Sequence, residues 1–199
     1  MSDSILKTPE HTVPTAFTRA QLDWLPWLEP LAVDAMTPRH QASLVDAARV
    51  KSPYFRLLAR DPDALEARTR TDKDIFYNPD GGLPRAEREL AAAATSRFNG
   101  CLYCASVHAR HAATYSKRED DVQRLLDAGV TADLDERWNA IIAASVALTA
   151  TPSLFGPEHV ERLRRAGLDD LAISDVIHAA AFFNWANRLM LSLGEPASV

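Results

Sequence analysis

The sequence is poor in cysteine and glycine and contains no long apolar run. It has only two cysteines among 199 residues, which excludes the multi-disulfide framework of a small secreted domain. Only seven glycines are present. Because apolar residues recur at helical spacing in most windows, we predict an all-α chain with no convincing strand. No apolar run approaches the roughly 20 residues that a membrane helix needs, so we expect no membrane partner.

An excess of positive charge is also lacking. Lys and Arg number 22 against 27 Asp and Glu, a formal net charge of -5, so no basic surface is expected to attract nucleic acid or anionic lipid. The residues from Met1 to Ser4 lack the basic and then apolar pattern of a signal peptide. We therefore predict a cytoplasmic globular protein, in which a cysteine pair favours redox chemistry or metal binding over a structural disulfide.

The chain is expected to form one domain preceded by an arm. Residues 1–17 are polar, which predicts an extended or mobile arm. Residues 18–199 are predicted to form a single helical domain. Within it, the sequence Asn-Pro-Asp-Gly-Gly at 78–82 is the strongest loop signal and separates an N-terminal helical part (18–77) from a C-terminal core (83–199).

Proline and capping residues mark the predicted helix ends. Pro26 and Pro30 interrupt the apolar segment 18–35, which is therefore predicted to be broken helix or extended packing. Asp133 is expected to cap a helix that carries Trp138 at core spacing. The other predicted helices span residues 38–50, 53–60, 61–77, 84–97, 101–115, 119–128, 157–166 and 169–193.

Both cysteines lie in one short motif that carries the chemistry. Cys101, Cys104 and His108 stand at i, i+3 and i+7, so they share one face if the segment is helical. Cys101 would lie in the first turn, where free amide groups and the helix dipole stabilise a thiolate. Cys104 lies one turn on and could form a disulfide with Cys101. His108 is then close enough to Cys104 to exchange a proton directly or through a water.

The preceding helix offers two carboxylates to orient the histidine. Glu87 and Glu89 point about 160° apart, so at most one can face the cysteine helix. Glu89 is the better candidate because it shares a stripe with Ala92, Ala93 and Ser96. These small side chains let two helices approach closely.

The turn signal Asn99-Gly100 decides whether the carboxylate can reach the imidazole. In one continuous helix, Glu89 and His108 would be about 28 Å apart. If the chain instead reverses at Asn99-Gly100 into an αα-hairpin, the two residues are about equally far from the bend and lie side by side. A carboxylate that accepts one imidazole N–H raises the basicity of the other ring nitrogen.

Other interpretations of these residues remain open at this point. The cysteines could be two small buried residues of a helix. Zinc could bind Cys101, Cys104, His108 and His111, but these extend over about 15 Å of one helix and could close round an ion only across a subunit interface. His111 itself is interpreted as a solvent or interface residue. Several aromatic residues are interpreted as core or subunit contacts, with a lid over an apolar substrate as the alternative: Trp24, Trp27, Phe182, Phe183 and Trp185.

The motif Glu89, Cys101, Cys104, His108 resembles a known family. Its spacing, Glu-x11-Cys-x2-Cys-x3-His, is that of AhpD-like alkylhydroperoxidases in the carboxymuconolactone decarboxylase superfamily. The flanking segments 83–90 and 98–104, with Asn184 to Leu189, look most like its uncharacterised peroxidase-related proteins. The resemblance covers about residues 20–195.

The resemblance implies an all-helical AhpD-like fold, assembled as trimers or hexamers, that reduces organic hydroperoxides. Electrons would come from a partner dithiol, either a lipoyl-type adaptor or a thioredoxin-like protein, and no haem, flavin or metal would be required. In the family scheme Cys104 attacks the peroxide, Cys101 resolves the sulfenic acid, and Glu89 with His108 relays the proton. The superfamily's decarboxylases lack the cysteine pair, which favours redox chemistry here.

Two points depart from this scheme. Well-studied members place a second histidine just before the second cysteine, where this sequence has Tyr103, a poor base at neutral pH. Helix-terminus electrostatics alone would also favour Cys101 as the reactive thiol. We assign the attack to Cys104 because the leaving oxygen needs the proton that the relay supplies. The alternative function is a general dithiol-disulfide oxidoreductase or redox sensor acting on a protein.

Overall fold

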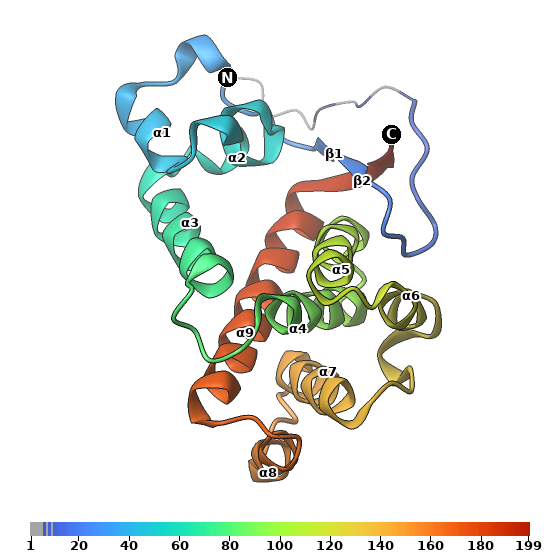
Figure 1. The fold of residues 1–199 in the computed structure, drawn as a ribbon. Coiled ribbons are helices and arrows are strands. Elements are labelled where there is room, and N and C mark those ends of the chain that lie inside the picture. Colours follow the sequence, from blue (N-terminus) through green and yellow to red (C-terminus); the bar gives the residue numbers. More distant parts are fainter. Residues whose placement is uncertain (1–5, 7, 9) are drawn as a thin grey trace.

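The computed structural model describes residues 6, 8 and 10–199, and these form a mainly helical fold (Figure 1). The predicted all-α class is confirmed, with one small sheet in addition. The helices are α1 (Pro38–Ser43), α2 (Pro53–Leu58), α3 (Pro62–Tyr77), α4 (Arg85–Phe98), α5 (Leu102–Ser116), α6 (Glu119–Ala128), α7 (Glu136–Thr149), α8 (Pro157–Arg165) and α9 (Asp170–Leu193). The strands are β1 (Leu22–Pro26) and β2 (Gly194–Ser198), and short 3₁₀ turns span Val33–Ala35, Ala47–Lys51 and Gly129–Thr131.

The two-stranded sheet corrects the prediction that the chain has no strand. β1 and β2 pair antiparallel, with Leu22 opposite Ser198 and Pro26 opposite Gly194. The extended alternative for segment 18–35 is therefore the right one over β1. A Cβ at Gly194 would lie 2.3 Å from the Leu25 carbonyl oxygen and 2.4 Å from the Trp24 ring. Glycine is needed there because the strands approach so closely.

Two predicted helix boundaries were wrong. α1 ends at Ser43, and the backbone then turns through Val45 at φ 62° into the 3₁₀ turn Ala47–Lys51, so residues 38–50 are not one helix. The cap of α7 is Asp135, whose carboxylate accepts a hydrogen bond from the Trp138 amide at 2.9 Å. The predicted cap, Asp133, instead accepts from the Asn139 side chain.

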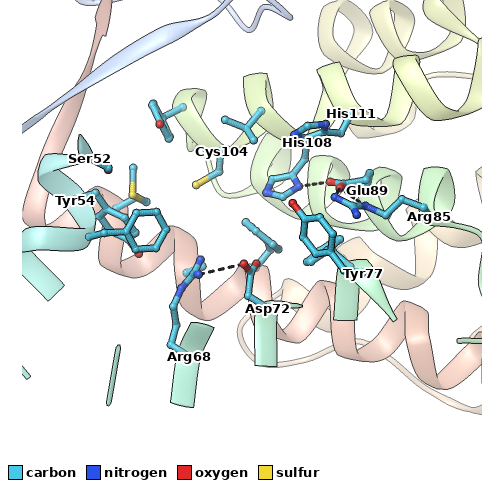
Figure 2. A pocket seen from close by; sticks show the side chains of 17 residues that line it. Ser52, Tyr54, Arg68, Asp72, Tyr77, Arg85, Glu89, Cys104, His108 and His111 are labelled. Atoms are coloured by element: carbon cyan, nitrogen blue, oxygen red, sulfur yellow. Dashed lines mark hydrogen bonds and ion pairs between the residues drawn. The ribbon is translucent and has the colours of Figure 1, made fainter. Parts of the chain in front are cut away.

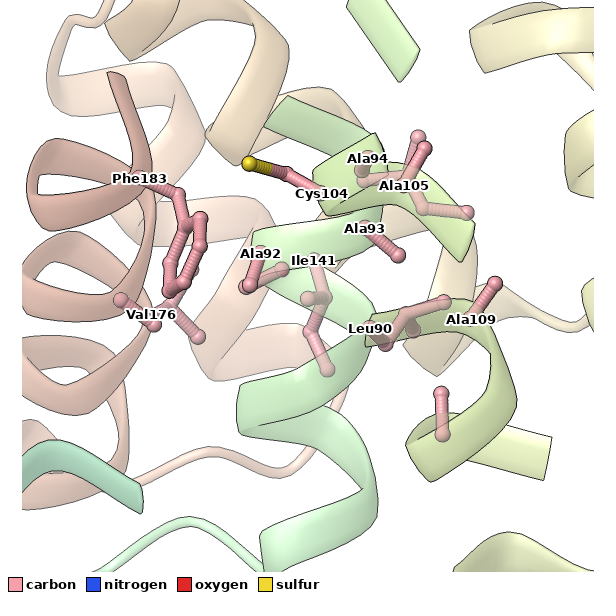
Figure 3. Packing of buried hydrophobic residues seen from close by; sticks show 14 of the residues in the cluster. Leu90, Ala92, Ala93, Ala94, Cys104, Ala105, Ala109, Ile141, Val176 and Phe183 are labelled. Atoms are coloured by element: carbon pink, nitrogen blue, oxygen red, sulfur yellow. The ribbon is translucent and has the colours of Figure 1, made fainter. Parts of the chain in front are cut away.

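Helix α4 forms the centre of the core. It packs against α5, α7 and α9, and every residue from Glu87 to Ser96 is buried. Ala93 and Ala94 of α4 face Ala105 and Ala109 of α5, as Figure 3 shows. These small side chains bring the two helix backbones close together. The close packing fixes the position of each α5 side chain relative to α4.

The loop between the N-terminal helices and the core is held by Arg88. Its Nη1 donates to the carbonyl oxygens of Ile75 and Asn78, both at 3.0 Å, and its Nε donates to Leu83 at 2.5 Å. The Leu83 amide in turn donates to Asp175 of α9 at 2.8 Å. These hydrogen bonds fix α3 against α4 and α9. The N-terminal helices and the core therefore pack against each other.

The predicted arm over residues 1–17 lies partly outside the described residues. Within the described part, the Leu6 amide donates to Trp27 and the Ser198 amide donates to Thr12, both at 2.9 Å. Across residues 6, 8 and 10–199, no helix combines the length and the apolar character needed to cross a membrane.

Candidate active site

A pocket of about 190 Å³ lies between the N-terminal helices and the core. Its walls come from α2, α3, α4, α5 and α9. Cys104, His108 and Glu89 all line it, whereas Cys101 is not among its lining residues. Figure 2 shows the Cys104 side chain projecting into the pocket, with the His108 imidazole on one side and Tyr54 on the other. The predicted site is therefore a cavity, with one of the two sulfurs exposed to it.

The bend that starts α5 places the first cysteine. Gly100 has φ 79°, a left-handed conformation that glycine adopts without strain. Cys101 is the N-cap residue of α5, and its amide donates to the Ser96 carbonyl at 2.9 Å. Both cysteines are buried, and both are free thiols.

Glu89 bonds the imidazole across this bend. The His108 Nδ1 and the Glu89 Oε2 are 2.5 Å apart, and both side chains are buried. The Arg85 Nε donates to the other oxygen, Oε1, at 2.6 Å. Glu87 points elsewhere and binds Arg137 at 2.7 and 2.8 Å. The choice of Glu89 over Glu87 as the carboxylate that reaches the histidine agrees with this geometry.

The electrostatics keep Glu89 ionised. Burial raises the pKa of Glu89, but the charges and hydrogen bonds of His108 and Arg85 outweigh burial, so the pKa is lowered. The carboxylate therefore holds the proton of His108 on Nδ1. This leaves Nε2 as the ring nitrogen that can accept a proton from a group in the pocket.

The two thiols interact with each other, with opposite effects on their pKa values. The pKa of Cys101 is lowered, mainly because Cys104 donates a hydrogen bond to its sulfur, while burial acts in the other direction. The pKa of Cys104 is raised by that same hydrogen bond and by burial. In the resting dithiol, Cys101 is thus the more acidic thiol and Cys104 holds the shared proton.

Asn187 is a candidate site residue that the motif did not reveal. Its side chain is fully buried on α9, and its amide lowers the pKa of each of the two cysteines. The amide is held in place because its Nδ2 donates to the Ser96 hydroxyl at 3.0 Å and its Oδ1 accepts from Asn99 at 3.1 Å. An asparagine within the apolar stretch of the last helix was the available signal.

Two side chains outside the motif, Phe183 and His111, also line the pocket. Phe183 packs against the His108 ring, with centroids 3.9 Å apart, so it is a wall of the site and not only a core contact. His111 also lines the pocket and is half-buried. Burial lowers the pKa of His111, against the opposing charge of Glu89.

One segment of the chain matches a known protein family. Residues 62–147 match the carboxymuconolactone decarboxylase family, and this segment contains all four residues of the motif. Over this segment, a little under half of its length, the chain is similar to that family. No curated protein matches the sequence.

Several solved structures share the fold of this chain. An AhpD-core, uncharacterised peroxidase-related protein from Ralstonia eutropha JMP134 is 24% identical with a TM-score of 0.71, covering 83% of this chain and 88% of that one. A peroxidase-related protein from Silicibacter sp. TM1040 is 22% identical with a TM-score of 0.68, covering 84% and 91%. The debrominase Bmp8 is 19% identical with a TM-score of 0.66, covering 82% and 88%.

Most of the residues that line the pocket lie outside the motif. Tyr54 of α2 and Arg68 and Asp72 of α3 line the side away from Glu89. Nothing in their local sequence distinguishes them from ordinary helix residues. Across residues 6, 8 and 10–199, no group of three or more His, Cys, Asp and Glu side chains is placed to hold a metal ion.

Proposed function

We propose that this protein reduces small organic hydroperoxides through a dithiol-disulfide cycle of Cys104 and Cys101. The observation that carries the proposal is that Cys104 and His108 line one buried pocket, with the imidazole bonded to Glu89 at 2.5 Å. The match of residues 62–147 to the carboxymuconolactone decarboxylase family and the fold shared with peroxidase-related proteins support the same reaction class.

The first step breaks the peroxide O–O bond. His108 Nε2 accepts the Cys104 proton, and Glu89 stabilises the imidazolium that forms. The thiolate attacks the terminal peroxide oxygen, which becomes the Cys104 sulfenic acid. The alkoxide leaves and takes the proton from His108 as the alcohol. The sulfur loses two electrons and the peroxide gains them.

The second step forms the disulfide. The Cys101 thiolate attacks the Cys104 sulfenic sulfur, and hydroxide leaves with a proton as water. The two thiol protons thus end in the alcohol and the water. The two sulfurs are buried, so the reductant must enter the pocket as a slender dithiol. A lipoyl-type arm satisfies this, whereas a thioredoxin-like protein would need the site to open.

Access favours Cys104 over Cys101 as the attacking thiol. Cys101 has the lowered pKa but does not line the pocket, whereas Cys104 lines it together with His108. A thiolate that cannot meet the peroxide has no advantage from its acidity. The lowered pKa of Cys101 suits the resolving step, because a more acidic thiol supplies the attacking thiolate more readily.

Two other functions use the same dithiol. A general oxidoreductase acting on protein disulfides is disfavoured because both sulfurs are buried. Reductive debromination is the second candidate, since the debrominase Bmp8 shares the fold and the pocket exceeds the roughly 150 Å³ that can hold a benzene ring.

The deciding experiment is anaerobic stopped-flow mixing of the reduced protein with cumene hydroperoxide. We expect rapid loss of two thiols per chain and one equivalent of cumyl alcohol, with the Cys104→Ser variant inactive. A rate no greater than that of free cysteine contradicts the proposal. A variant of the debrominase Bmp8 is solved in complex with 2,3,4-tribromopyrrole. Thiol oxidation by that compound with bromide release, in place of peroxide reduction, would support reductive debromination instead.

A further inference from the structure

The pocket has a second polar end, formed by α2 and α3, that the proposed chemistry does not use. Arg68, Asp72 and Tyr54 lie there, on the side away from the Glu89–His108 pair (Figure 2). The Arg68 guanidinium reaches up from α3 toward Cys104. Only 8% of the Arg68 side chain is exposed, and Tyr54 is 7% exposed. Charged and hydroxyl groups this deeply buried need partners.

Hydrogen-bond donors at this end lack acceptors. Among the described residues, the Tyr54 hydroxyl and the Nε and Nη1 of Arg68 are buried atoms without a hydrogen-bond partner. The Nη1 lies 3.3 Å from an oxygen of Asp72, which is an ion pair without hydrogen-bond geometry. Buried donors of this kind are rare in proteins unless a ligand or water completes them.

At this end of the pocket, two positively charged side chains pair with a single carboxylate. One oxygen of Asp72 is shared by Arg68, at 3.3 Å, and by Arg49, at 3.1 Å. Two guanidinium groups are therefore balanced by one carboxylate. Both guanidinium groups lie over the Phe55 ring, at 5.4 and 4.6 Å from its centroid. A buried cation left over in this way favours an anionic ligand.

The pocket also has apolar walls. Phe55, Phe76, Phe183 and Met190 are among its lining residues. A volume of about 190 Å³ accommodates a ligand with a single ring or a short branched chain. The site is therefore shaped for a small apolar body that carries one acidic group.

We propose that the pocket selects small carboxylate-bearing substrates, with Arg68 and Tyr54 binding the carboxylate while the reacting group faces Cys104 and His108. The identity of the reacting group, a hydroperoxide, rests on the proposed function above. The evidence for the carboxylate subsite is separate: hydrogen-bond donors of Arg68 and Tyr54 have no partner, and two arginines share the single carboxylate of Asp72. The two can therefore be tested separately.

Benzoate and benzamide are the probes for the subsite, because they have the same shape and differ in charge. Isothermal titration of the reduced protein, without peroxide, should show benzoate binding at least about tenfold more tightly than benzamide, as expected for a charge-assisted hydrogen bond. Arg68→Met should remove this preference. Arg70→Met, an exposed arginine of the same helix paired with Glu66, should leave it unchanged.

Asp72→Asn separates a binding role from a structural one. Removing the carboxylate that competes for Arg68 should strengthen benzoate binding, whereas damage to the fold would weaken it. Equal affinities for benzoate and benzamide in the native protein, or weaker benzoate binding in Asp72→Asn, overturn the inference.

Inhibition kinetics test whether the carboxylate subsite and the reactive thiol share one pocket. Benzoate should slow thiol oxidation by cumene hydroperoxide more than benzamide does, because it occupies the same pocket. If benzoate binds as expected but no hydroperoxide oxidises the thiols, the carboxylate subsite stands and the proposed function fails. If cumene hydroperoxide is reduced but benzoate shows no preference over benzamide, the inference fails and the proposed function stands.

Discussion

The Oε2 of Glu89 lies 2.5 Å from the Nδ1 of His108, although the two residues belong to different helices. The bend at Gly100 makes this contact possible, and the alanines between α4 and α5 fix its register. Because the other carboxylate oxygen binds Arg85, neither the acid nor the imidazole can rotate freely. The pair is preorganised before any substrate enters the pocket.

Glu89→Gln should slow peroxide reduction without preventing it. A neutral amide cannot stabilise the imidazolium, so we expect the rate of thiol oxidation at pH 7 to fall by about 100-fold, the lower range for loss of acid-base assistance. Stopped-flow kinetics with cumene hydroperoxide measures this rate. The matched control is Glu87→Gln on the same helix, which loses its bond to Arg137 but does not line the pocket. Equal rate losses in the two variants would show a structural effect only.

The stability of Glu89→Gln should depend on pH. Glu89 has a folded-state pKa below its usual value near 4.5, so its stabilising contribution is complete above that value and is lost as pH falls through the folded pKa. We expect the variant to be less stable by about 3 kcal/mol at pH 7, with the difference shrinking below about pH 4.5. Urea unfolding of both proteins at several pH values measures it. A difference that grows on acidification would show that the folded carboxyl is neutral.

The parts of the site that the sequence predicted depend on local rules. The helical period selected Glu89 over Glu87, and the turn residues Asn99 and Gly100 predicted the reversal. Each of these signals lies within a few residues of the feature that it predicts. The αα-hairpin and the contact from Glu89 to His108 could therefore be inferred before the structure was known.

The parts that escaped prediction depend on long-range packing. Arg68 and Tyr54 reach the pocket because the loop at Arg88 fixes α3 against the core, and no local pattern reports that placement. β2 has the sequence Gly-Glu-Pro-Ala-Ser, which has little strand propensity, and it is extended because it pairs with β1. Val45 adopts a left-handed conformation, which is unusual for a β-branched residue, and nothing in the sequence signals it.

Asn187→Ala should shift the reactivity of the thiols toward higher pH. The amide lowers the pKa of both cysteines, so its removal should raise both values and reduce the thiolate fraction at pH 7. We expect alkylation by iodoacetamide to slow at pH 7, because less thiolate is present, and to recover at higher pH. Asn184→Ala is the control, since Asn184 also accepts a bond from Asn99. A rate loss that is equal at all pH values would mean damaged packing instead.

The order in which the two cysteines react can be decided by trapping the sulfenic acid with dimedone. Cys104 lines the pocket and Cys101 does not, so the Cys101→Ser variant should form a stable adduct on Cys104 after one equivalent of cumene hydroperoxide. Cys104→Ser retains Cys101, whose pKa is lowered mainly by a hydrogen bond from position 104 that the serine hydroxyl can still donate. It should nevertheless form little adduct, because that thiol does not meet the peroxide. Mass spectrometry locates the adduct, and trapping only in Cys104→Ser would show that acidity outweighs access and that Cys101 attacks first.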